Sequence, residues 1–155
     1  MKKYINLIFA LFLLTFTACQ DDAEIPSTGN PVNVVEEASG TYTGTWTVTN
    51  EEGAVVGTYP GTLTVGKYTV APEEKYACTL TLTCDGYDEI GGTGAANILK
   101  QSRAYRFYNE MDTNGLGSTF TGTITFEGAC TMSYKKTVTE GRKKITYFFS
   151  FDGNK

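Results

Sequence analysis

The chain has 155 residues and a net charge of −4 at pH 7, with 13 Lys and Arg against 17 Asp and Glu. This acidic balance argues against nucleic acid and anionic membrane surfaces as main partners, because both require basic patches. The chain has no histidine, which removes the commonest general base and every nucleophile pair that depends on one. Carboxylates in expected turns (Asp85, Asp88, Glu89, Glu110, Asp112) are interpreted as solvated. We therefore expect no enzyme activity, no metal and no cofactor.

The N-terminus has the pattern of a secretory signal peptide over residues 1–18. Lys2 and Lys3 precede an apolar run over 7–14, and small residues follow it. The run is shorter than the roughly 20 residues of a membrane-spanning helix. The sequence Phe-Thr-Ala-Cys at 16–19 resembles the lipobox of bacterial lipoproteins. This resemblance implies that Cys19 becomes the acylated N-terminus and anchors the protein in a lipid bilayer.

The segment 19–38 is expected to be the lipidated N-terminus and a flexible linker, because it contains Pro and Gly and has no clear period. Its acidic run at 21–24 resembles the signal of lipoproteins that some Gram-negative lineages export to the cell surface; a solvated linker is the alternative. We expect attachment to the outer membrane in the cell envelope and leave the membrane face open. Loss of residues 1–18 removes two lysines, leaving 11 basic and 17 acidic residues, a net charge of −6.

The remaining part, 39–155, is one domain by length, and it alternates with the period of two that is typical of half-buried strands. Over 41–49, one face carries Tyr42, Trp46 and Val48, and the other carries threonines. The windows 76–84, 119–126, 130–134 and 145–151 repeat this pattern. The stretch 85–102 is less clear: its glycine-rich first part is expected to be a loop, and 95–101 fits a short helix or a strand.

The expected fold is an all-β antiparallel meander of about eight strands that closes into a small barrel. Closure is favoured because the first and last strands would otherwise be open edges. Gly44-Thr45-Trp46 resembles the Gly-x-Trp start of lipocalins and the wider calycin group. The resemblance implies a calycin-like barrel in which Trp46 closes one end and a basic residue near the last strand packs across it. The matching basic residues are Arg142, Lys143 and Lys144.

An eight-stranded barrel is either packed solid or holds one small ligand, and two functions follow. We expect first that the barrel binds a small apolar ligand between inward-facing aromatic residues. The alternative is a filled barrel whose loops and outer surface contact an envelope protein or a glycan. The candidate contacts are Tyr87 and the loop 85–94, with Tyr105, Arg106 and Tyr108 if they face outward. The aromatic residues expected to line the cavity are Tyr42, Trp46, Tyr105, Phe107, Phe120, Phe126, Tyr147 and Phe149.

Three cysteines remain besides Cys19. Cys78 and Cys84 share one strand face six residues apart, about 20 Å, which is too far for a disulfide. We favour buried free thiols, while a bridge from one of them to Cys130 stays open in an oxidising envelope.

Overall fold

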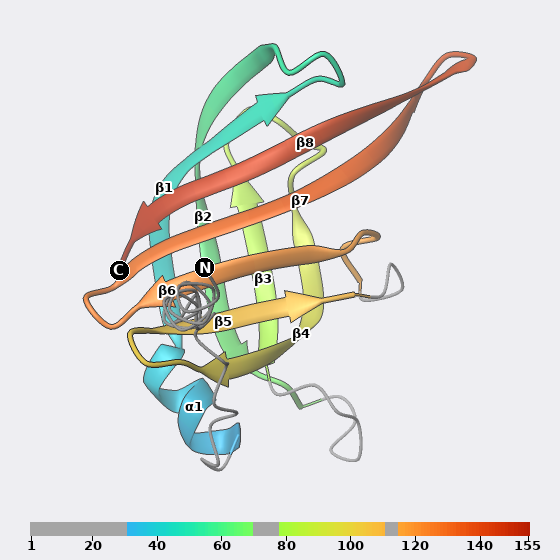
Figure 1. Cartoon of the computed structure of the whole chain (residues 1–155). Coiled ribbons are helices and arrows are strands. Elements are labelled where there is room, and N and C mark those ends of the chain that lie inside the picture. Colours follow the sequence, from blue (N-terminus) through green and yellow to red (C-terminus); the bar gives the residue numbers. More distant parts are fainter. Residues whose placement is uncertain (1–30, 70–77, 111–114) are drawn as a thin grey trace, which may run out of the picture.

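Eight antiparallel strands form a closed barrel in sequence order, and the first strand pairs with the last (Figure 1). The computed structural model describes residues 31–69, 78–110 and 115–155; the expected signal peptide, Cys19 and the acidic run lie outside them. The expected all-β meander that closes into a barrel is thereby confirmed. The elements are α1 (Pro31–Ala38), β1 (Gly40–Thr49), β2 (Val55–Lys67), β3 (Cys78–Cys84), β4 (Gly92–Lys100), β5 (Ala104–Asn109), β6 (Phe120–Thr125), β7 (Ala129–Glu140) and β8 (Lys143–Asn154).

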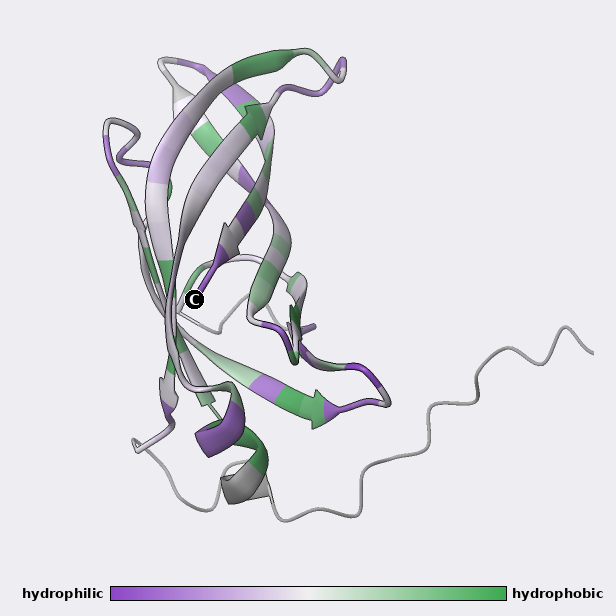
Figure 2. Ribbon diagram, turned by 90° about the vertical axis from the view of Figure 1, so that its left-hand side faces the viewer, coloured by the Kyte–Doolittle hydropathy of each residue, from purple (hydrophilic) through white to green (hydrophobic). Residues whose placement is uncertain are grey.

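The barrel closes between β1 and β8 because apolar side chains face each other on the inner side of this pair and polar side chains on the outer side. Trp46 lies opposite Phe151, and both side chains are buried. The outward threonines of β1 pair with polar positions such as Ser150 and Asp152. Hydrophobic bands alternate with paler or polar ones along the strands (Figure 2). Since side chains alternate between faces, this pattern places one apolar face inside.

The hairpin of β7 and β8 is the longest in the barrel and extends past the neighbouring strands (Figure 1). Its pairing runs from Ala129 opposite Asn154 to Glu140 opposite Lys143. Gly141, at φ +64°, forms the tight turn, a conformation that glycine adopts without steric cost. By contrast, β6 pairs with β7 only as far as Tyr134, so the tip of the hairpin leaves the barrel wall.

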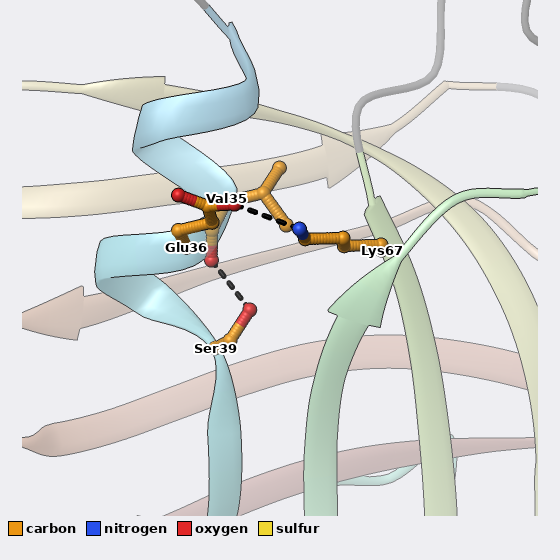
Figure 3. Close-up of polar contacts among 4 residues, drawn as sticks. All are labelled: Val35, Glu36, Ser39 and Lys67. Atoms are coloured by element: carbon orange, nitrogen blue, oxygen red, sulfur yellow. Dashed lines mark hydrogen bonds and ion pairs between the residues drawn. The ribbon is translucent and has the colours of Figure 1, made fainter.

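The short helix α1 packs at the barrel end where β1 begins and β2 ends. Val34, Val35 and Ala38 are buried in the core. Glu36 reaches Lys67 at the end of β2, with 2.7 Å between Oε1 and Nζ, and the Ser39 hydroxyl donates to the Val35 carbonyl at 2.6 Å (Figure 3). The described part of the expected linker is therefore a helix bound to the barrel, because its apolar residues fall on one helical face.

The secondary structure of the glycine-rich stretch 85–102 also differs from the expectation. Residues 92–94 belong to β4 and not to a loop, and the open choice for 95–101 resolves as strand up to Lys100. Gly92 and Gly94 pair with Leu82 and Leu80 of β3. Pairing along a well-formed neighbour outweighs the weak strand propensity of glycine. Within the described residues, no helix is long and apolar enough to cross a membrane.

Candidate functional site: a filled barrel with an outer groove

The barrel interior is filled by large side chains. Trp46, Phe107 and Phe151 are each at most 2% exposed. Inward-facing glycines lie next to these rings, and the absence of a Cβ atom leaves the space that the rings occupy. A Cβ atom added at Gly61 would lie 2.7 Å from Cδ1 of Trp46, and one at Gly122 would overlap the ring of Phe107. Aromatic rings thus occupy the space above glycines, as in interiors packed to the density of organic crystals.

Trp46 is a core residue that is fixed by a hydrogen bond and by contacts with two other aromatic rings. Its indole Nε1 donates to the carbonyl of Thr83 at 3.0 Å. Its ring centroid lies 4.9 Å from that of Phe151 and 5.9 Å from that of Tyr134, the latter edge-on. These contacts fix the indole inside the barrel with its only polar atom satisfied.

The basic residues matched to the lipocalin pattern do not reach Trp46. Arg142 and Lys144 are exposed at the tip of the β7–β8 hairpin. Lys144 is seven residues along β8 from Phe151, which pairs with Trp46, a separation of about 23 Å. The structure therefore does not bring the tryptophan and these cations together, and the barrel ends are covered by other residues.

At the α1 end, a buried tyrosine and an ion pair join the helix to the barrel. The Tyr42 hydroxyl donates to the carbonyl of Ala38 at 2.7 Å, and the Tyr105 hydroxyl donates to Oε2 of Glu37 at 2.7 Å. Lys100 pairs with the same carboxylate at 2.5 Å. The hydrogen bonds from Lys100 and then Tyr105 hold the pKa of Glu37 below its usual value. Burial, and then the Glu37 carboxylate, raise the pKa of Tyr105 to about 12.

At the opposite end, the β3–β4 loop folds over the core. Ile90 is 2% exposed, and the ring of Tyr87 lies 5.0 Å from that of Tyr59 and 6.1 Å from that of Phe149. Lys136 of β7 donates to the carbonyl of Glu89 at 3.1 Å and so holds the loop in place. Both ends of the barrel are therefore covered by segments of the chain.

A groove of about 530 Å³ lies mainly on the outer face of the barrel. This volume is within the roughly 300–1,000 Å³ of small-ligand sites. Its floor is a row across four strands: Tyr108 of β5 lies opposite Thr121, which lies opposite Ser133, which lies opposite Ser150 of β8. Most lining residues occupy outward-facing strand positions, the ends of β5 and β6 contribute others, and the buried rings of Tyr134 and Phe149 lie at the inner margin of the groove. The lining residues are Thr49, Arg106, Tyr108, Asn109, Glu110, Thr119, Phe120, Thr121, Ser133, Tyr134, Lys135, Phe148, Phe149 and Ser150.

The groove exists because short side chains lie among long ones. Ser133 and Ser150 are exposed hydroxyls, whereas Lys135 and Phe148, a register pair two residues farther along the same strands, are long and exposed. Phe148 is 46% exposed. The row from Tyr108 to Ser150 spans three strand spacings, about 14 Å.

Charge is uneven along the groove. Arg106 and Lys135 contribute two cations and Glu110 one carboxylate, on a protein whose net charge is −4. The guanidinium of Arg106 lies 5.5 Å from the centroid of the Tyr108 ring, within the range of a cation–π contact. The groove is thus a locally cationic, hydroxyl-rich and partly aromatic surface.

Most of the aromatic residues expected to line a cavity do point inward, but they pack against one another. Tyr147 is half-buried beside Phe149, with 6.5 Å between ring centroids. Phe126 is 47% exposed outside the core, because β6 ends at Thr125 and the chain turns there; its ring lies against Tyr105, with 5.1 Å between centroids. The buried residues of the expected set are Tyr42, Trp46, Tyr105, Phe107, Phe120 and Phe149.

Of the residues expected to contact a partner, Arg106 and Tyr108 line the groove, whereas Tyr105 faces inward and Tyr87 covers the barrel end. Phe120 and Phe149, which were expected to line an internal cavity, are also among the lining residues of the groove. The other residues of the groove were not found from the sequence. The signal that could have found it is Phe148, an apolar residue on a face that otherwise reads as polar. An aromatic residue on a solvated strand face marks a candidate contact surface.

The three described cysteines are free thiols. Cys78 and Cys130 are buried, and burial raises the pKa of each to about 12. Cys84 is half-buried, and its pKa is raised chiefly by burial. In the described part of the chain, no group of His, Cys, Asp and Glu is placed to hold a metal ion.

Comparison with protein-family models, with curated proteins and with solved structures finds no match. The lipocalin-like and lipoprotein assignments therefore rest on the residues that carry each resemblance and stay predictions.

Proposed function

We propose that this protein is a membrane-anchored envelope lipoprotein whose barrel is a filled, non-catalytic scaffold, and that it binds a partner through the outer groove. The observation that carries the proposal is the contrast between the two faces of the barrel. On the inner face, aromatic rings pack directly against glycine residues of neighbouring strands, whereas the outer face has a groove of about 530 Å³. The space available for a bound partner is therefore in the outer groove and not in the barrel interior.

The same packing argues against a small apolar ligand inside the barrel. Such a ligand would have to displace rings such as those of Phe107 and Phe151, which are at most 2% exposed. Removing a buried Phe ring from its contacts costs about 3–5 kcal/mol. In addition, α1 and the β3–β4 loop cover the two ends. The outer surface is the better supported of the two sites.

The groove is tested by crosslinking in intact cells. A small diazirine-bearing residue replaces Ser150 in the groove, and a matched protein carries it in place of Thr83, an exposed residue of β3 across the barrel. We expect light to produce an adduct of defined mass from position 150 and none from position 83. No adduct from position 150, or the same adduct from both positions, contradicts the proposal.

The anchor is tested separately. Cys19→Ser removes the thiol that the lipobox resemblance implies is acylated. We expect the substituted protein to lose its acyl mass and to leave the membrane fraction. Cys84→Ser, a half-buried thiol in the barrel, serves as the control and is expected to stay in the membrane. If Cys19→Ser keeps the same membrane attachment and the same mass of modification, the lipoprotein assignment is wrong.

A further inference from the structure

We infer that the outer groove binds a short oligosaccharide that carries at least one carboxylate. The inference rests on the proposed function, because it names the partner of the same groove. It follows from the order of side chains across the strands and from the charge along the groove.

The floor of the groove presents a row of hydroxyls. Thr121, Ser133 and Ser150 follow one another on three neighbouring strands. A hydroxyl group both donates and accepts hydrogen bonds and rotates to suit its partner. A sugar presents hydroxyls of the same kind at a similar spacing along its ring edge. A row of short hydroxyl side chains about 10 Å long therefore suits the edge of an oligosaccharide.

The ends of the row present aromatic rings. Tyr108 begins the row on β5, and Phe148 lies beside its other end on β8. Phe148 is 46% exposed and Tyr108 is half-buried, so each ring has a free part. The C–H face of a pyranose ring packs on such a surface, while the hydroxyls beside it meet the polar floor. Other small barrels bind oligosaccharides on an outer strand face in this general way.

The cations supply the preference for an acidic sugar. Arg106 and Lys135 outnumber Glu110 in the groove, and both are long donors suited to carboxylates. In an otherwise acidic protein, two cations beside a hydroxyl row favour a carboxylate-bearing glycan over a neutral one. Two cations are too few for a nucleic acid, which is held by extended basic patches.

A protein segment fits the groove less well. Each strand along the hydroxyl row is already paired with both of its neighbours, so an extended segment cannot add there as a further strand. Centres of protein interfaces are depleted in charge and enriched in apolar residues, whereas this floor is hydroxyl. We therefore treat a protein partner as an outcome of the test.

The test is binding of the full lipidated protein, in mild detergent, to an array of neutral and uronic- or sialic-acid-containing di- to hexasaccharides. We expect binding to acidic members of the array that weakens as salt is added, because partly exposed charges are screened. Phe148→Ala and Lys135→Gln are each expected to weaken this binding about tenfold, as for residues that anchor a ligand.

Matched controls lie outside the groove. Phe126→Ala removes a ring that is 47% exposed at the α1 end, and Lys143→Gln removes an exposed charge at the hairpin tip. Both are expected to leave binding unchanged. The inference is overturned if no glycan binds, if neutral glycans bind equally well, or if the controls weaken binding as much. An array without binding, together with a protein crosslinked at position 150, would reject the glycan and leave the proposed function standing.

Discussion

Gly122 shows at the residue scale how tightly the barrel is packed. It lies on the inward face of β6, and the ring of Phe107 occupies the space where a side chain would begin. The backbone carbonyl of Thr131 lies on the same side, 2.5 Å from an added Cβ. Neither group can move without disturbing the core, so this glycine is required by a close approach of ring and backbone.

Gly122→Ala is therefore expected to lower the free energy of unfolding by about 1–3 kcal/mol, as overpacking in a core does. Urea unfolding measures the change. Gly91→Ala is the control, because an added Cβ there has the carbonyl of Leu82 at 3.8 Å as its nearest neighbour; its effect is expected to stay within about 0.5 kcal/mol. Equal stability of the two variants would mean that the interior has free space.

The thiols give a second prediction at this scale. Only the thiolate reacts with iodoacetamide, and burial raises the pKa of both Cys78 and Cys130 to about 12. In the folded protein at pH 8, half-buried Cys84 is expected to react first, and the other two only after unfolding. Peptide mass analysis over time follows the order, and Cys84→Ser removes the early step. A pair that resists alkylation in denaturant until a reductant is added would reveal a disulfide.

At the scale of elements, α1 is the part that depends on the rest of the molecule. An eight-residue helix is marginal in isolation, so its stability comes from packing on the barrel. The sequence does contain its apolar face, Val34, Val35 and Ala38, but Pro and Gly nearby favour a linker. Lys67 and Lys100, whose ion pairs hold this segment on the barrel as a helix, are 31 and 63 residues away from Glu36 and Glu37. Such distant pairs cannot be read from local pattern.

The carboxylate of Glu37 predicts a pH dependence for this helix. Hydrogen bonds from Lys100 and Tyr105 lower its pKa in the folded protein. A lowered carboxyl pKa contributes stability that is present above its usual value of 4.5 and is lost as the pH falls through the lowered pKa. Glu37→Gln is therefore expected to be less stable than the wild type at pH 7, with a difference that shrinks as acid is added.

Urea unfolding from pH 3 to pH 7 measures this difference, and hydrogen exchange of the α1 amides shows whether the helix is the part affected. Glu51→Gln in the exposed β1–β2 turn is the matched control. A Glu37→Gln difference that stays constant with pH, or that grows in acid, would contradict the role given to this carboxylate.

At the scale of the whole molecule, the alternation of threonine with apolar residues predicts the meander, and the open edges that its first and last strands would otherwise present predict its closure. The alternation could not determine whether the barrel is filled, because volume depends on which ring lies over which glycine. Gly61 beside Trp46 is such a pair, and the two belong to different strands. The groove could not be predicted from the sequence either, because its residues also come from different strands. Tyr108 and Ser150 are 42 residues apart in the sequence, and only strand register places them in one row.

The central claim is that the barrel is filled and that binding takes place outside. The most direct test is native mass spectrometry of the protein purified in mild detergent from its own membranes. We expect the mass of the mature chain with its acyl groups and no further apolar molecule, because the interior rings leave no room for one. An additional mass of a few hundred daltons that is retained in the folded protein and released only on unfolding would contradict the claim.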